Sequence, residues 1–163
     1  MKKAGLILTC TILACISCMA PMPMQDLADN IPHMDFENIR AVMSFVAERV
    51  EYVPDAVMHY PVKGYWQSPL QTYMWQTGDC EDFCILAMYF IRSEFYMEPM
   101  LASGWYDGLR HGWVEVGGEY WEPQTGTNVT DNGRYELLEL LDYDEVMRRA
   151  TITHKQLAVW PTD

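Results

Sequence analysis

The hydrophobic pattern changes its period near residue 100, and this change most constrains the fold. Before it, the apolar residues of segment 36–49 recur at three- and four-residue steps, which is typical of an amphipathic helix with Asp35 as its expected N-cap. After it, residues 100–105 and 111–116 read as strands, and Gly117-Gly118 before residues 119–121 is a strong hairpin signal. Helices followed by antiparallel strands predict an α+β fold.

Two further helices are predicted between these regions. Ser68 as a cap, Pro69 in the first turn and Gln71 three residues after the cap favour a short helix that should stop at Gly78. The next helix should begin at residue 79 or 80. Its apolar residues are dense on all sides, so we expect it to be the buried central helix.

The C-terminal part predicts a loop, a strand and a last helix. Residues 124–134 are rich in Gly, Asn and Thr and are expected to form a loop. Residues 135–141 fit a strand or a helix, and their place after a loop favours the strand. Asp142 together with Glu145 is expected to cap a short helix that ends at Arg149.

The N-terminal residues are expected to direct export. A short basic start and the apolar run 6–16, too short to span a bilayer, predict a signal peptide over residues 1–18. Cys15 and Cys18 each follow a small residue, as in a bacterial lipobox, and we favour Cys18 as the lipidated residue; ordinary secretion is the alternative. Residues 19–34 would be a tether and 35–163 the folded domain, held at the bacterial cell envelope by the lipid anchor as its sole membrane contact.

The charge of the exported chain argues against nucleic-acid binding. Removing the leader near residue 18 leaves 9 basic and 23 acidic residues, a net charge of −14. Such a surface repels phosphate backbones and anionic lipids. The folded part then holds Cys80 and Cys84, whose spacing on one helix does not suit a disulfide. An exported domain with an isolated cysteine among charged residues favours a catalytic interpretation.

Cys80 stands in the first turn of the predicted central helix. The helix dipole there lowers the pKa of a thiol, and the free backbone N–H of that turn can bind a developing oxyanion. Asp79, Glu81 and Asp82 oppose this, because neighbouring negative charge raises the pKa of the thiol. The site therefore requires a cation, either a protonated histidine or a metal ion.

His111 is the histidine that a rigid hairpin can aim at the thiol. If Gly117-Gly118 forms a two-residue turn, strand alternation places His111 and Glu122 on one face as diagonal neighbours. A carboxylate at that place can fix the tautomer of an imidazole. A three-residue turn would move Glu122 to the other face.

Three motifs in this order resemble the transglutaminase-like superfamily, and within it the bacterial transglutaminase-like cysteine proteinases. The resemblance covers residues 35–123, is aided by residues 65–69, and rests on three segments: Gly78-Asp79-Cys80-Glu81-Asp82-Phe83, His111-Gly112-Trp113-Val114-Glu115-Val116 and Trp121-Glu122-Pro123.

The resemblance implies a papain-like core, in which a central helix bearing the cysteine packs on an antiparallel sheet bearing the histidine and the acid. The catalytic triad would map to Cys80, His111 and Glu122, although the family usually has Asp at the third position. Calcium-binding acids of the proteinase branch would map to Asp79 and Glu81. The acyl chemistry itself requires no cofactor.

Several simpler interpretations stay open at this point. Cys80 could be a structural thiol, and Trp66, a candidate for the oxyanion site or the groove, could be a core residue. Helix capping and solvation explain the acids around Cys80 as well as calcium does. A zinc site with Cys84 lacks a clear fourth ligand.

The expected function is acyl transfer from peptide or side-chain amides through an acyl-enzyme, with hydrolysis favoured. The substrate would be a protein or peptide at the cell envelope. The alternative is a non-catalytic transglutaminase-like binding module, suggested by the missing Asp at position 122. The sequence leaves the oligomeric state open.

Overall fold

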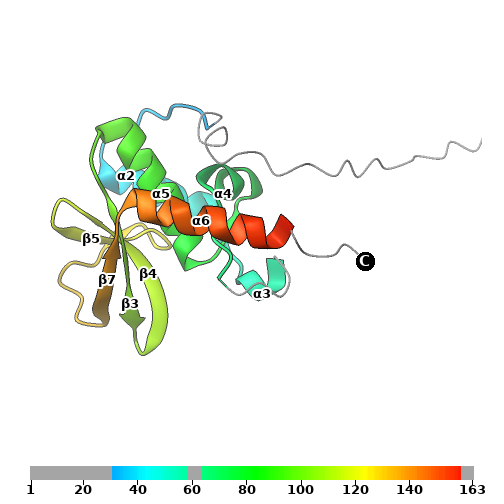
Figure 1. Ribbon diagram of the computed structural model, residues 1–163. Coiled ribbons are helices and arrows are strands. Elements are labelled where there is room, and N and C mark those ends of the chain that lie inside the picture. The colour runs from blue at the N-terminus through cyan, green and yellow to red at the C-terminus, as the bar shows by residue number, and fades with distance from the viewer. Residues whose placement is uncertain (1–30, 59–63, 159–163) are drawn as a thin grey trace, which may run out of the picture.

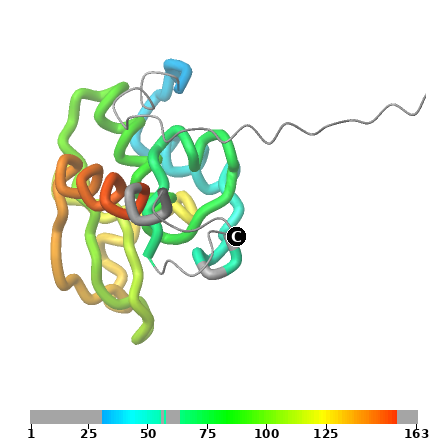
Figure 2. The backbone as a smooth tube through the Cα atoms, turned by 45° about the vertical axis from the view of Figure 1, so that its right-hand side comes forward, coloured from blue at the N-terminus to red at the C-terminus, as the bar shows by residue number. Residues whose placement is uncertain are grey.

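The computed structural model describes residues 31–58 and 64–158, which form helices packed against a five-stranded antiparallel sheet. Figures 1 and 2 show the sheet on one side and the helices on the other, with α6 running across the helical side. The predicted leader 1–18, both candidate lipidation residues Cys15 and Cys18, and most of the tether lie outside the described residues. The helices are α2 (Ile39–Arg49), α3 (Asp55–Met58), α4 (Pro69–Trp75), α5 (Cys80–Phe95) and α6 (Tyr143–Ala158).

The sheet confirms the predicted α+β class. Its strand order is β6-β5-β4-β3-β7, and every neighbouring pair is antiparallel. The short strands β1 and β2 pair in parallel away from this sheet. The strands are β1 (Glu51–Tyr52), β2 (Thr77–Gly78), β3 (Met100–Tyr106), β4 (Leu109–Val116), β5 (Glu119–Glu122), β6 (Thr127–Asn128) and β7 (Tyr135–Leu141).

Helix α5 is the buried centre of the domain, as its apolar sequence predicts. Its side chains from Phe83 to Met88 are all buried, and they pack between α2, α4 and strand β4. The ring of Phe90 meets Phe36 and Phe45 edge-on at centroid distances of 5.2 and 5.5 Å. Burying aromatic rings of this size contributes about 2 kcal/mol each, so this contact anchors α2 against the central helix.

Two predicted helix boundaries in the N-terminal half are wrong. Helix α2 begins at Ile39, because Asn38 caps it by accepting the backbone N–H of Ala41, so Asp35 is not the cap. Helix α4 ends at Trp75, because Gln76 adopts a left-handed conformation with φ 58°. The predicted cap at Ser68 is confirmed, with the Ser68 and Gln71 side chains bonding each other's backbone N–H groups.

The C-terminal elements agree only in part with the prediction from the sequence. The expected loop contains the short strand β6, which pairs with β5, and the strand 135–141 is confirmed as β7. Asp142 accepts the N–H of Glu145, as predicted, but α6 continues to Ala158, well past Arg149. Ile31, placed in the predicted tether, is buried in the core cluster.

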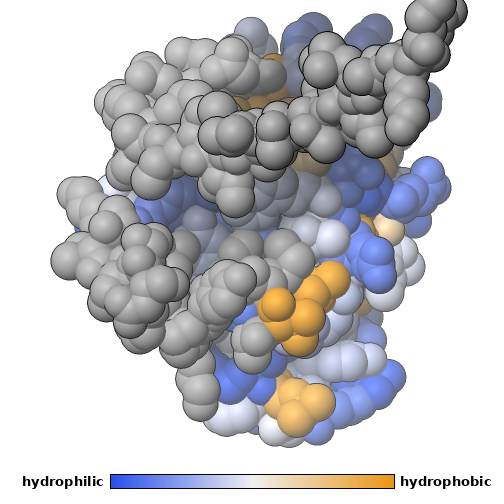
Figure 3. All heavy atoms as spheres, turned by 90° about the vertical axis from the view of Figure 1, so that its right-hand side faces the viewer, coloured by the Kyte–Doolittle hydropathy of each residue, from blue (hydrophilic) through white to orange (hydrophobic). Residues whose placement is uncertain are grey.

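Among the described residues, no helix is long and apolar enough to cross a membrane. On the face drawn in Figure 3, the visible described side chains are mainly hydrophilic, and hydrophobic ones stand in separate spots. A continuous apolar surface is therefore not visible on that face.

Candidate active site

Cys80 is the first residue of α5, where the sequence predicts it. Its own backbone N–H belongs to the first turn, whose donors have no partner within the helix. The preceding Gly78 has no room for a side chain, because a Cβ there would lie 2.6 Å from the Cβ of Asp82. The carboxylate of Asp82 instead accepts the N–H of Asp79 at 3.2 Å. Gly78 and Asp82 together therefore hold Cys80 at a tight helix start.

His111 and Glu122 meet on the opposite wall of the site. Gly117-Gly118 is a two-residue turn, since Val116 pairs with Glu119 and Val114 with Trp121, and this confirms the predicted register. Nε2 of His111 lies 2.5 Å from Oε2 of Glu122. Their side chains are only 13% and 4% exposed, so little water competes for this contact. The carboxylate fixes the proton of a neutral imidazole on Nε2 and leaves Nδ1 as the basic nitrogen.

Glu122 has two more hydrogen-bond partners. The hydroxyl of Tyr135 donates to Oε2 at 3.1 Å, and the backbone N–H of Gln124 donates to Oε1 at 3.0 Å. Tyr135 comes from β7, and its ring packs edge-on against Trp113 at 5.1 Å. Both oxygens of the buried carboxylate are thus satisfied, which fixes its orientation.

One pocket of about 240 Å³ brings the predicted nucleophile and base together. Helix α5 lies directly against β4 here, since a Cβ at position 112 would make ordinary contacts of 3.8 Å with the sulfur of Cys84 and 3.9 Å with the carbonyl oxygen of Cys80. The lining also includes Trp66, the predicted groove residue. The pocket is lined by Trp66, Cys80, Glu81, Leu101, Ser103, Arg110, His111 and Gly112.

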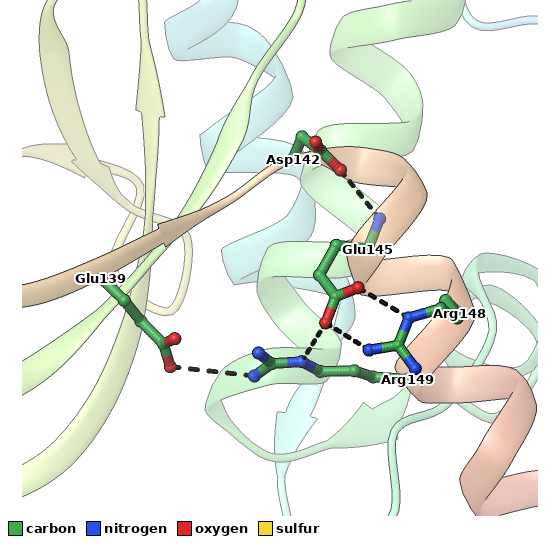
Figure 4. A network of polar contacts seen from close by, with 5 residues as sticks. All are labelled: Glu139, Asp142, Glu145, Arg148 and Arg149. Carbon is green, nitrogen blue, oxygen red and sulfur yellow. Dashed lines mark hydrogen bonds and ion pairs between the residues drawn. The ribbon is translucent and has the colours of Figure 1, made fainter.

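Trp66 is held at the pocket wall by α6. The hydroxyl of Thr153 accepts the Trp66 backbone N–H at 3.3 Å, and the Arg149 guanidinium lies 5.6 Å from the centre of the indole. Figure 4 shows how Arg149 is fixed: Glu145 holds it from within α6 and Glu139 reaches it from β7. The last helix, which is longer than the sequence predicts, therefore supports the wall of the pocket.

The charge around Cys80 opposes a thiolate, as expected from its neighbours. The thiol donates to Oε2 of Glu81 at 3.1 Å. Burial raises the pKa of Cys80, and the carboxylates of Glu81 and Asp79 raise it further, while the N–H of Gly112 acts in the other direction. A buried thiol with two carboxylates beside it needs a cation to ionise near neutral pH.

A cluster of carboxylates adjoins the nucleophile. Asp79 groups with Cys80 and Glu81 on one side, and with Asp55 and Asp82 on the other, with ligand atoms within 4.8 Å of one another in each group. Burial, followed by the charge of Asp79, raises the pKa of Asp55 to about 6, and burial also raises the pKa values of Asp79 and Asp82.

The donors of this cluster fit a hard cation. Oδ1 of Asp79 is buried and has no hydrogen-bond partner among the described residues. Carboxylate oxygens are the ligands that Ca²⁺ prefers, whereas the sulfur of Cys80 is not. The cluster can therefore hold a metal ion through its oxygens.

Comparison with solved structures identifies the fold. No family model matches the chain, and no curated protein matches it. Legionella pneumophila LapG matches with a TM-score of 0.51 and 14% identity, covering 82% of this chain and 85% of the LapG chain. The EGTA-treated form of LapG matches with a TM-score of 0.53 and 14% identity, covering 82% of this chain and 86% of the LapG chain. The calcium-bound form matches with a TM-score of 0.50 and 15% identity, covering 77% of this chain and 86% of the LapG chain. LapG has the transglutaminase-like fold.

The chain has the transglutaminase-like fold. In this fold the central helix α5 presents Cys80, and the hairpin of β4 and β5 presents His111 and Glu122, as the sequence resemblance implied. Cys84, one turn after Cys80, is fully buried in the core and takes no part in either metal-ligand group.

Four residues of the site are not among the site residues predicted from the sequence. Tyr135, Asp55, Asp82 and Arg110 reach the site from β7, α3, α5 and β4. Only Asp82 carries a local signal, since it stands within the acidic run around Cys80. The others come from segments distant from Cys80 along the chain.

Proposed function

We propose that this protein is a thiol-dependent acyl-transfer enzyme that hydrolyses amide bonds of a protein or peptide at the cell envelope. The observation that carries the proposal is the shared pocket of Cys80 and His111, with His111 held at 2.5 Å by Glu122. The transglutaminase-like fold supports it. Export, with lipid anchoring at Cys18 or Cys15, belongs to the same proposal and rests on the leader sequence.

The residues suit a two-step reaction. His111 takes the thiol proton on Nδ1, and the sulfur of Cys80 attacks the carbonyl carbon of the amide. The backbone N–H of Cys80, in the first turn of α5, would stabilise the oxyanion. As the C–N bond breaks, His111 returns its proton to the leaving amine. A water molecule, deprotonated by His111, then adds to the thioester, and the acid and the free thiol are released.

We further propose that the acid cluster holds Ca²⁺ through Asp79, with Glu81, Asp55 and Asp82 as the other carboxylate donors. The unpartnered Oδ1 of Asp79 and the grouping of the acids support this, as does the calcium-bound form of LapG. When bound, the cation would offset the negative charge beside the thiol. The chain's own residues perform every step of the acyl chemistry.

A second candidate is a non-catalytic binding module of the same fold. It is favoured by one observation, that the thiol donates to Glu81 instead of to His111. In this case Cys80 would behave as an ordinary buried thiol.

The rate of Cys80 alkylation by iodoacetamide, measured against pH with and without Ca²⁺, separates the two functions. For the enzyme we expect labelling well below pH 8 in Ca²⁺, loss of labelling in Cys80→Ala, and labelling about 10² times slower in His111→Ala. Labelling that requires alkaline pH in Ca²⁺, together with no effect of His111→Ala, would identify the binding module.

A further inference from the structure

Among the described residues, Arg110 is the one arginine that lines the pocket of Cys80, in a chain of net charge −12. On β4 it alternates with His111, so it faces the same side of the sheet as Gly112, toward α5. Its guanidinium lies 5.4 Å from the centre of the Trp105 ring and donates to the hydroxyl of Ser103 at 3.0 Å. The ring and the hydroxyl hold the cation in place before any ligand arrives.

The guanidinium has no acidic partner among the side chains that the structure describes. Across residues 31–58 and 64–158, no carboxylate lies within 4.0 Å of Arg110, whereas Arg92, Arg134, Arg148 and Arg149 all have one. A guanidinium offers five N–H donors in a planar fork that matches a carboxylate. The neutral Ser103 hydroxyl leaves most of them available.

We propose that Arg110 binds a carboxylate of the substrate and thereby selects peptides with an acidic group beside the amide that Cys80 attacks. This inference rests on the proposed function and names its substrate class. Two features of the pocket support it. The volume of about 240 Å³ suits a few side chains of a short segment. Glu81, the one carboxylate of this lining, belongs to the proposed cation site, which leaves Arg110 as the permanently cationic side chain of the lining that can meet an acidic group.

Two alkylating reagents of nearly the same shape test the charge preference. Iodoacetate carries a carboxylate and iodoacetamide does not, so the ratio of their rates at Cys80, followed by mass spectrometry of the Cys80 peptide, reports the local field. We expect Arg110→Gln to lower the iodoacetate/iodoacetamide ratio by about two- to fivefold and Arg110→Glu to lower it further.

Arg40→Gln is the matched control. Arg40 is also exposed, lies 5.3 Å from the centre of a tryptophan ring, and has no carboxylate partner among the described residues, but it does not line the pocket. Its replacement should leave the ratio unchanged. An equal ratio in wild type and Arg110→Gln, or an equal fall in Arg40→Gln, overturns the proposal. Both reagents alkylate any ionised thiol, so the ratio is measurable at alkaline pH even if Cys80 proves not to be activated.

Three short peptides identify the source of the carboxylate. The dipeptides are acetyl-Ala-Glu-amide, acetyl-Ala-Gln-amide and acetyl-Ala-Gln with a free C-terminus, each tested for protection of Cys80 from iodoacetamide. If only acetyl-Ala-Glu-amide protects Cys80, the carboxylate that Arg110 binds is an acidic side chain. If only acetyl-Ala-Gln with a free C-terminus protects it, the carboxylate is the C-terminus of the peptide. Either preference should vanish in Arg110→Gln. Equal protection by all three, or none by any, contradicts recognition of a peptide carboxylate.

Discussion

The Nε2 atom of His111 and the Oε2 atom of Glu122 are 2.5 Å apart, and the hydroxyl of Tyr135 reaches the same oxygen at 3.1 Å. Glutamate is one methylene longer than the aspartate that the resemblance to the transglutaminase-like superfamily implies at this position. Tyr135 and the N–H of Gln124 hold the longer side chain in a single orientation. The acid is thus fixed by β7, which lies on the other side of β4 from β5, and by the turn that follows β5.

Glu122→Gln should slow alkylation of Cys80 at neutral pH by about 10²-fold, because an amide cannot stabilise the imidazolium that the reaction forms. The measurement is the second-order rate with iodoacetamide across pH 5–9. Glu119→Gln, an exposed acid on the same strand, is the control. A pH profile in Glu122→Gln that matches wild type would remove Glu122 from the site.

Tyr135→Phe should slow the same reaction by about fivefold, since it removes one hydrogen bond of roughly 1 kcal/mol to the Glu122 carboxylate while the ring still packs on Trp113. Tyr106→Phe, in which the replaced ring lies 4.6 Å from that of Tyr135 at a tilt of 37°, should change the rate little. A shifted pH profile with an unchanged Tm would show a positioning role. Equal profiles for the two variants would show that the hydroxyl of Tyr135 does not orient the acid.

Removal of Ca²⁺ by EGTA should lower both the Tm and the rate of Cys80 alkylation. Ligand binding at 100 times its Kd stabilises a fold by about 2.7 kcal/mol. Asp79→Asn, at the ligand shared by both acid groups, should abolish the effect of Ca²⁺ in calorimetry and in the labelling assay. Asp131→Asn, an exposed acid outside the cluster, should retain it. A Tm that does not change when Ca²⁺ or EGTA is added would exclude the proposed ion.

Gly104→Ala should destabilise the domain by about 1–3 kcal/mol or more, because its Cβ would overlap the carbonyl oxygen of Glu136 and approach the Trp113 ring to 2.8 Å. Gly112→Ala is the matched change on the next strand. Its nearest contact would be ordinary, 3.8 Å to the sulfur of Cys84, so we expect a change below about 1 kcal/mol in urea unfolding. Similar losses in both variants would contradict this packing.

Lowering the pH should decrease the free energy of unfolding through protonation of His154. Burial lowers the pKa of His154, whose ring stacks on Tyr65 at 5.1 Å and whose Nε2 lies 3.0 Å from the Tyr65 hydroxyl. Below about pH 6.5 the unfolded chain binds a proton that the folded chain resists, so the free energy of unfolding falls as the pH decreases. His154→Phe keeps a ring on Tyr65 and should remove this contribution to the free energy of unfolding between pH 5 and 7.

The sequence predicted the elements that depend on neighbouring residues. The cap at Ser68, the start of the central helix at Cys80 and the glycine turn at 117–118 are each set by bonds within a few residues. Strand alternation from that turn is then sufficient to place His111 and Glu122 on one face. The predicted cap at Asp35 was wrong, because the side chain of Asn38 accepts the N–H of Ala41 and the helix begins at Ile39.

By itself, then, the sequence determined the α+β class, the helix that carries Cys80 and the register of the hairpin. Only the tertiary structure decided which residues from other segments complete the site. Asp55, Arg110, Tyr135 and the Arg149 that supports Trp66 lie far from Cys80 along the chain, and packing alone brings them to it. Side-chain contacts between distant segments depend on how the layers pack, and no local pattern of residues encodes that arrangement.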